Sequence, residues 1–127
     1  MSDYKKLGVT KKAHQLTLDL YRVTESLPRT EIFGLTSQIR RAASSINANL
    51  AEGSARGSER DFLRFLRIAI GSVSELEYHL VLAKDLKFIG EQEFQKLEKQ
   101  RQEVGAMLSG LATAVKRRIQ MQVTVTR

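Results

Sequence analysis

The side chains of this chain that can do chemistry are mainly cations, and arginine supplies the densest run of them. Residues 40–70 contain six arginines and no lysine, against three acidic side chains. A guanidinium presents a planar fork of N–H donors that matches the oxygens of a phosphate. Together with three consecutive cations near the C-terminal end, these arginines form the predicted nucleic-acid-binding set: Arg40, Arg41, Arg56, Arg60, Arg64, Arg67, Lys116, Arg117 and Arg118.

Three of these arginines have helical spacing. Arg60, Arg64 and Arg67 are separated by four and three residues, which places them on one face of a helix. Such a row can follow a nucleic-acid backbone through phosphate contacts. It can equally be a solvated helix face that pairs with Glu59 and nearby acids, and the sequence leaves both interpretations open. The run 116–118 has a similar second interpretation, because cations near a helix C-terminus complement the helix dipole.

The sequence lacks the residue patterns of known metal and catalytic sites. The chain has no cysteine and two histidines, neither of which belongs to an HExxH motif. Glu75 and His79 stand four apart, whereas di-iron bundles use a spacing of three, so we interpret His79 as a packed helix residue. The turn at residues 53–58 offers backbone N–H groups to an anion, but it is also typical of a helix C-cap followed by an N-cap. We predict no enzyme activity, no catalytic residue, no metal site and no cofactor.

Composition sets broader limits. A chain of 127 residues is predicted to form one domain, with residues 1–9 and 119–127 as frayed tails. The net charge of +7 favours an anionic partner. No apolar run reaches the roughly 18 residues of a membrane span, and the start of the chain lacks the apolar core of a signal peptide. We therefore expect a cytoplasmic protein with no membrane partner.

Apolar spacing predicts four helices that would position the cations, at about residues 10–27, 35–52, 58–86 and 91–118. Pro28 ends the first and Gly53 the second, while Ser58 and Asp61 cap the third. The third helix carries a strict heptad seam of Phe62, Leu66, Ala69, Val73, Leu76, Leu80 and Ala83. Arg101 interrupts the seam of the fourth. The predicted fold is all-α, an antiparallel up-and-down four-helix bundle.

The third helix has a second apolar edge, formed by Leu63, Ile70 and Val81. A single bundle seam does not need this edge. It can pack inside a wider monomer core, or it can be an oligomer interface, and both alternatives stay open.

Four sequence motifs between Phe33 and Leu86 carry a family resemblance: GLTSQIRRAASSI, NLAEG, FLRFLRIAIGS and ELEYHL. They resemble the four-helix-bundle family of 23S rRNA intervening-sequence proteins, and the flanking segments fit that family's length. A related branch resembles the accessory protein that partners reverse transcriptase in diversity-generating retroelements. The resemblance implies a bundle that assembles as a homopentamer and associates with nucleic acid or a ribonucleoprotein without catalysis.

Two hypotheses follow. In the first, a non-enzymatic, homo-oligomeric bundle binds RNA or a ribonucleoprotein through its basic surface. With three tyrosines and no tryptophan, sequence-specific reading of single strands is disfavoured. In the second, the protein is an interaction scaffold or accessory subunit, for example of a reverse transcriptase, that does not bind nucleic acid directly.

Overall fold

Four α-helices joined by short connections make up the structure. A computed structural model describes the backbone of residues 3–126 and the side chains of residues 3–124. The α-helices are α1 (Gly8–Thr24), α2 (Leu35–Ala55), α3 (Glu59–Asp85) and α4 (Glu91–Thr126), and short 3₁₀ turns form η1 (Tyr4–Lys6) and η2 (Arg29–Glu31). The described residues include no strand. The predicted all-α fold class is confirmed.

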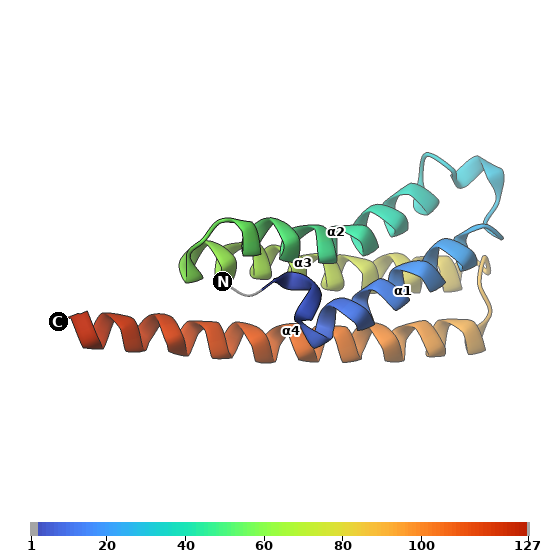
Figure 1. Cartoon of the computed structure of the whole chain (residues 1–127). Coiled ribbons are helices and arrows are strands. Elements are labelled where there is room, and N and C mark those ends of the chain that lie inside the picture. Colours follow the sequence, from blue (N-terminus) through green and yellow to red (C-terminus); the bar gives the residue numbers. More distant parts are fainter. Residues whose placement is uncertain (1–2, 127) are drawn as a thin grey trace.

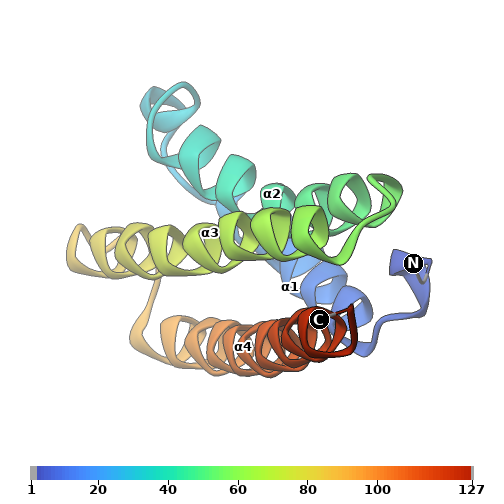
Figure 2. The ribbon, with the colours of Figure 1, turned by 90° about the vertical axis from the view of Figure 1, so that its left-hand side faces the viewer.

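The helices pack in a closed cycle. Each one contacts its neighbours in the chain, and α1 also contacts α4. In Figure 1, α3 and α4 run side by side while α1 and α2 slope across them. Figure 2, seen from the end where α4 terminates, shows α2 and α3 together above α4. This arrangement is the predicted helical bundle.

The core is built from the apolar spacing of the four helices. Every heptad position of α3 is buried, and Ser58 caps the helix by accepting a hydrogen bond from the backbone N–H of Asp61 at 3.1 Å. The largest side chains that are almost fully enclosed are Leu16, Leu20, Ile39, Ile46, Leu50, Leu66, Leu76, Leu80, Leu97, Val104, Leu108 and Val115. Their burial against one another is the main source of stability.

Gly53 does not end the second helix as predicted. The helix α2 continues to Ala55, and the backbone turns at Gly57, which has a φ of 83°. Gly53 is instead buried against α3, where an added Cβ would lie 2.8 Å from the Cβ of Phe65. The glycine is needed because α2 and α3 approach each other closely at this point.

Most described residues of the predicted frayed tails are helical, the exceptions being Asp3 and Leu7. Helix α1 begins at Gly8, and α4 continues past the expected end at Arg118 to Thr126. The C-terminal extension arises because Ile119 and Val123 repeat the spacing of four that starts at Val115. Residues 1, 2 and 127, which also belong to the predicted tails, lie outside the described residues.

The second apolar edge of α3 turns toward the body of the bundle. Leu63 is buried, and Ile70 and Val81 are partly buried against the core cluster. These three side chains therefore contact the core of their own bundle.

Arg101 lies buried in the seam between α4 and α3 because two carboxylates accept its hydrogen bonds. Its Nε lies 2.6 Å from Oε1 of Glu98, and its Nη2 lies 3.1 Å from Oε2 of Glu77. The hydrogen bond from Arg101 holds the pKa of Glu98 below its usual value. The interruption seen in the sequence is therefore a charged contact between two helices.

Candidate nucleic-acid interface

An open groove with a volume of about 770 Å³ lies between the first turns of α3 and the last turns of α4. Glu59, the first residue of α3, lies level with Arg118, since the two side chains form an ion pair. The end of α4 therefore extends past α3, by about 12 Å at 1.5 Å per residue, as Figure 1 shows. The groove is lined by Arg60, Leu63, Arg64, Arg67, Lys116, Ile119, Gln120, Val123 and Thr124.

Four cations form the rim of this groove. Arg60, Arg64 and Arg67 come from α3, which confirms that they share one face, and Lys116 comes from α4. The fold thus joins the two basic clusters that the sequence shows far apart. Among the described residues that line the groove, none carries a carboxylate. The rim is therefore a site of concentrated positive charge.

Three of the four rim cations have no partner in the described part of the chain. The side chains of Arg60, Arg67 and Lys116 make no hydrogen bond and no ion pair with a described residue. Arg64 has a long contact of 3.7 Å between Nη2 and Oδ1 of Asp61, and its guanidinium lies over the ring of Phe65 at 4.5 Å. The N–H donors of Arg60, Arg67 and Lys116 are available to an external anion, because no carboxylate of a described residue occupies them.

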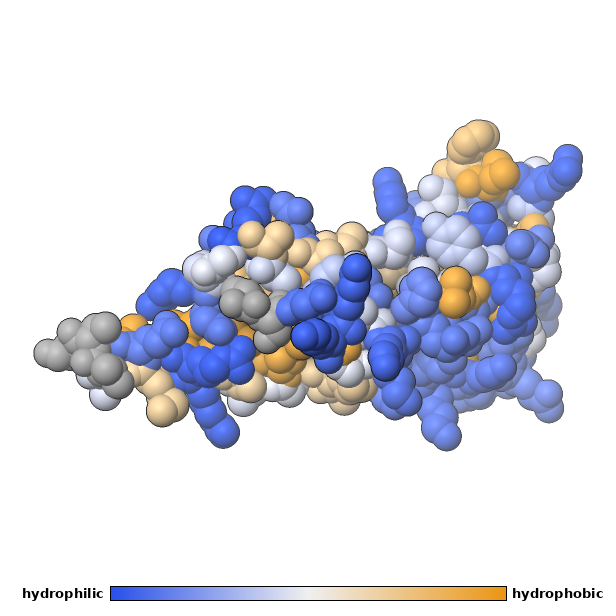
Figure 3. All heavy atoms as spheres, in the orientation of Figure 1, coloured by the Kyte–Doolittle hydropathy of each residue, from blue (hydrophilic) through white to orange (hydrophobic). Residues whose placement is uncertain are grey.

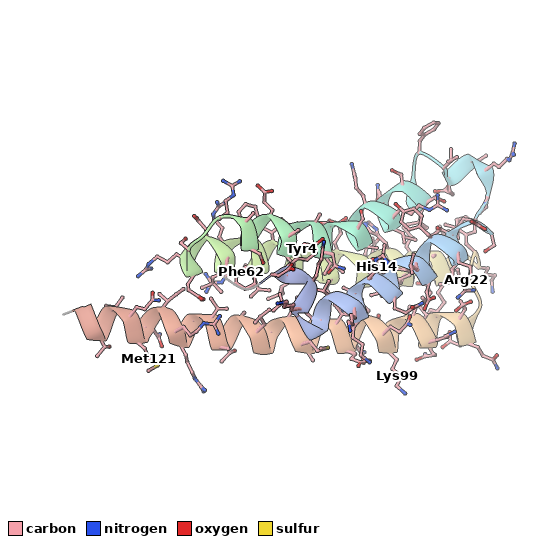
Figure 4. The ribbon with its side chains drawn as sticks, viewed as in Figure 1. Tyr4, His14, Arg22, Phe62, Lys99 and Met121 are labelled. Carbon is pink, nitrogen blue, oxygen red and sulfur yellow. The ribbon has the colours of Figure 1, made fainter. Side chains whose placement is uncertain are left out.

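The floor of the groove is apolar. Leu63 and Ile119 are 8% and 9% exposed, and Val123, at the projecting end of α4, is 39% exposed. Met121 leaves the opposite side of α4, away from α3, as Figure 4 shows. The groove therefore combines a cationic rim with an aliphatic base.

Arg118 and Arg56 belong to the folded scaffold beside the groove. Arg118 donates two hydrogen bonds to Oε2 of Glu59 at 3.2 and 3.1 Å, which ties α4 to the start of α3. Arg56 pairs with Glu52 at 2.6 Å. Arg117 is exposed and lies near Met121, in a separate shallow hollow. We therefore place none of these predicted contact residues in the groove.

Arg40 and Arg41 lie elsewhere on the molecule. Arg40 donates hydrogen bonds to Oγ1 of Thr24 at 2.9 Å and to the carbonyl of Tyr21 at 3.1 Å, so it fastens α2 to α1. Arg41 is exposed on α2. Arg56 marks the end of α2 that lies beside the groove. Arg40 precedes it by sixteen residues, which is about 24 Å of helix, so Arg40 and Arg41 lie too far away to line the groove.

Sequence reasoning missed the contribution of α4 to the groove. The prediction of a frayed tail at residues 119–127 includes four lining residues: Ile119, Gln120, Val123 and Thr124. The useful signal was the apolar spacing of four, which continues from Val115. The apolar edge residue Leu63 also lines the groove.

The remaining candidates are structural. His79 is 8% exposed, and its Nε2 lies 3.0 Å from Oε2 of Glu75, in agreement with a packed role. The described residues contain no group of three or more histidines, cysteines and acids that could hold a metal ion. No helix in the same part of the chain is long and apolar enough to cross a membrane.

Comparison with known proteins agrees with this architecture. The family model for the 23S rRNA-intervening sequence protein matches residues 5–110, which is most of the chain. The chain belongs to this family. None of the curated proteins compared with the chain matches it. The family description and the solved structure below name no catalytic activity.

A solved structure shows the same fold. It is a crystal structure of a protein of unknown function from the S23 ribosomal protein family, from Bacteroides thetaiotaomicron. The TM-score is 0.76 and the sequence identity 24%, and the match covers 83% of this chain and 95% of the other. This chain and this neighbour therefore share the same fold.

Proposed function

We propose that the protein is a non-enzymatic RNA-binding module that holds RNA, or the RNA of a ribonucleoprotein, on the cationic rim between α3 and α4. The observation that carries this proposal is that Arg60, Arg67 and Lys116, from two helices, converge without an acidic partner among the described residues. The family match, whose description refers to an rRNA intervening sequence, supports RNA as the anion.

The chemistry of the rim fits phosphates better than bases. Guanidinium and ammonium groups bind phosphate oxygens without reading sequence. The described residues that line the groove include no aromatic side chain, so base stacking adds little. The proposal therefore implies binding that depends on salt and tolerates changes of RNA sequence.

We also propose that the protein acts as a homo-oligomer, a pentamer by resemblance to its family. Each copy would carry one groove, and several weak phosphate contacts would then act together. Such avidity would raise the affinity for a long RNA above that for a short one.

The salt dependence of RNA binding tests the proposal. With four phosphate contacts per groove, the affinity for a labelled RNA hairpin should fall about 50-fold to 150-fold between about 50 and 200 mM salt. Changing Arg60, Arg64 and Arg67 together to glutamate should lower the affinity about 100-fold at the lower salt concentration. Fluorescence anisotropy measures both effects, and light scattering shows whether each variant keeps its oligomeric mass.

A matched control separates the groove from net charge. Lys11, Arg29 and Lys99 are exposed and make no ion pair in the described part of the chain, so changing all three to glutamate alters the charge equally. This control should keep RNA affinity within about threefold of the parent protein. An equal loss in both triple variants, or no binding at low salt, would refute the proposed interface.

A further inference from the structure

The floor of the groove has no role in phosphate binding. Phosphates bound to the rim would leave the apolar floor without a ligand, because Leu63, Ile119 and Val123 offer no donor. Val123 is 39% exposed, whereas Leu63 and Ile119 expose only 8% and 9% of their surface at the base of the groove. An accessible apolar strip inside a charged rim is typical of a surface that receives an apolar partner.

The floor has the spacing of a helix-binding surface. Ile119 and Val123 stand one turn apart on α4, and Leu63 faces them from α3. Side chains from Lys116 to Thr124 cover about 12 Å, or two turns of helix. A groove between two helices receives a third helix through apolar residues at positions i, i+3, i+4 and i+7.

The charge of the rim specifies which helix fits. All charged lining residues are cations, and three of the four have no acidic partner among the described residues. A purely apolar helix would desolvate these cations without compensation. A helix whose apolar stripe is flanked by glutamate or aspartate would satisfy both the rim and the floor.

The projecting end of α4 from a second copy does not supply such a segment. The projecting end of α4 is basic, with Lys116, Arg117 and Arg118. The acidic residues near Arg101, Glu77 and Glu98, already pair with that arginine. The apolar stripes of the helices face their own core.

We propose that the groove binds an acidic amphipathic helix of a partner protein. Apolar side chains of that helix fill the floor over Leu63, Ile119 and Val123, and its carboxylates pair with Arg60, Arg67 and Lys116. The two ligands would use the same rim, so the helix and RNA exclude each other. The exclusion, unlike the docking itself, rests on the proposed RNA-binding function.

A synthetic peptide tests the docking directly. The probe is a labelled peptide of about four turns, with leucines at i, i+3, i+4 and i+7 and glutamates on both flanks. Its control is a peptide of identical composition whose leucines are scattered around the helix. Fluorescence anisotropy without RNA should show at least about tenfold tighter binding of the amphipathic peptide.

Variants of the floor separate the two ligands. Val123→Gln should weaken peptide binding about tenfold and leave RNA affinity within about twofold, because Val123 contacts no phosphate. Val123→Ile should retain peptide binding. The projecting position of Val123, 39% exposed, makes both changes compatible with folding, which a thermal melt checks.

Each result decides between the proposals. Equal affinity for the two peptides would overturn the docked helix, as would a Val123→Gln variant that loses RNA and peptide equally. Peptide binding without any RNA binding would refute the RNA function and support the docking. If both bind, the peptide should displace the RNA in competition, and simultaneous binding of both to one groove would overturn the shared rim.

Discussion

At the scale of single residues, the neighbours of each arginine decide its role. Arg40 binds the Thr24 hydroxyl and the Tyr21 carbonyl, and Arg101 binds two carboxylates, whereas Arg60 and Arg67 have no such partner among the described residues. The helical row was predictable because it depends on spacing within one helix. The partners of Arg40 were not, because they lie on another helix, 16 and 19 residues away in sequence.

Gly53 provides a test of the close contact between α2 and α3. Gly53→Ala places a methyl group 2.8 Å from the Cβ of Phe65 and 3.2 Å from Cδ1 of Phe62. We expect the free energy of unfolding to fall by about 1–3 kcal/mol, because the packed rings must shift. Urea unfolding followed by circular dichroism measures this change.

Gly71→Ala is the matched control. Gly71 lies inside α3, and nothing stands within 4 Å of an added Cβ. Alanine restricts the unfolded chain and favours the helix, so stability should rise by about 0.5–1 kcal/mol. A Gly53→Ala protein as stable as Gly71→Ala would contradict the close contact.

At the scale of elements, α4 explains both a success and a failure of the sequence prediction. Its first turns were predictable from apolar spacing and from acidic residues at its start, Glu91 and Glu93. Its end was not, because polar and β-branched residues alternate there. The apolar face of Ile119 and Val123 continues the helix, which strand-like alternation obscured.

Truncation tests the projecting end of α4. A chain that stops after Ile119 keeps the four rim cations but loses Gln120, Val123 and Thr124 from the groove. We expect RNA affinity within about threefold of the full chain, and peptide affinity reduced at least about tenfold.

Anisotropy with each labelled ligand measures these affinities, and a thermal melt checks that the shortened chain is folded. The core ends at Ile119, so the melting temperature should change little. Full peptide affinity in the truncated chain would place the docking surface elsewhere.

At the scale of the whole molecule, ionised carboxylates link α4 to its two neighbours. Asp19 of α1 accepts a hydrogen bond from Gln100 at 2.9 Å, and Glu98 and Glu77 flank Arg101 between α4 and α3. The hydrogen bond from Gln100 lowers the pKa of Asp19, and that from Arg101 lowers the pKa of Glu98. The amino-acid sequence does not reveal these links between helices, because the linked residues lie far apart along the chain, although it predicts the helices themselves.

Acid should therefore loosen the bundle. Groups whose pKa is lowered by folding contribute stability above their unfolded pKa of about 4, and this stability is lost as the pH falls through the folded value. We expect these two carboxylates to contribute fully between about pH 5 and 7 and progressively less below about pH 4. Urea unfolding at a series of pH values measures the trend.

Glu98→Gln should flatten the acid limb of that profile, because the variant has no carboxyl proton to gain there. Glu25→Gln serves as the control, since Glu25 is exposed and has no ion pair with a described residue. It should reproduce the parent profile. If stability falls as steeply at acid pH in Glu98→Gln as in the parent protein, protonation of Glu98 does not contribute to the acid destabilisation.

The end of the bundle far from the groove also exposes apolar side chains. Figure 3 shows hydrophilic side chains over most of the visible face and a hydrophobic tip beside the connection from α1 to α2, where Ile32 and Phe33 are 56% and 94% exposed. Ile32 lines a hollow there together with Arg40 and Arg41. Both ends of the bundle therefore combine apolar and cationic side chains.

The continuous helix at the end of α4 also offers a rigid attachment point whose length and direction can be set residue by residue. A reporter domain fused through an unbroken helix after residue 126 would advance about 1.5 Å and rotate about 100° with each added residue. Inserting one to four alanines would therefore sweep the reporter around the axis of α4 and past the mouth of the groove. With one fluorophore on the reporter and one on a ligand in the groove, energy transfer across this series would measure the position of the bound ligand.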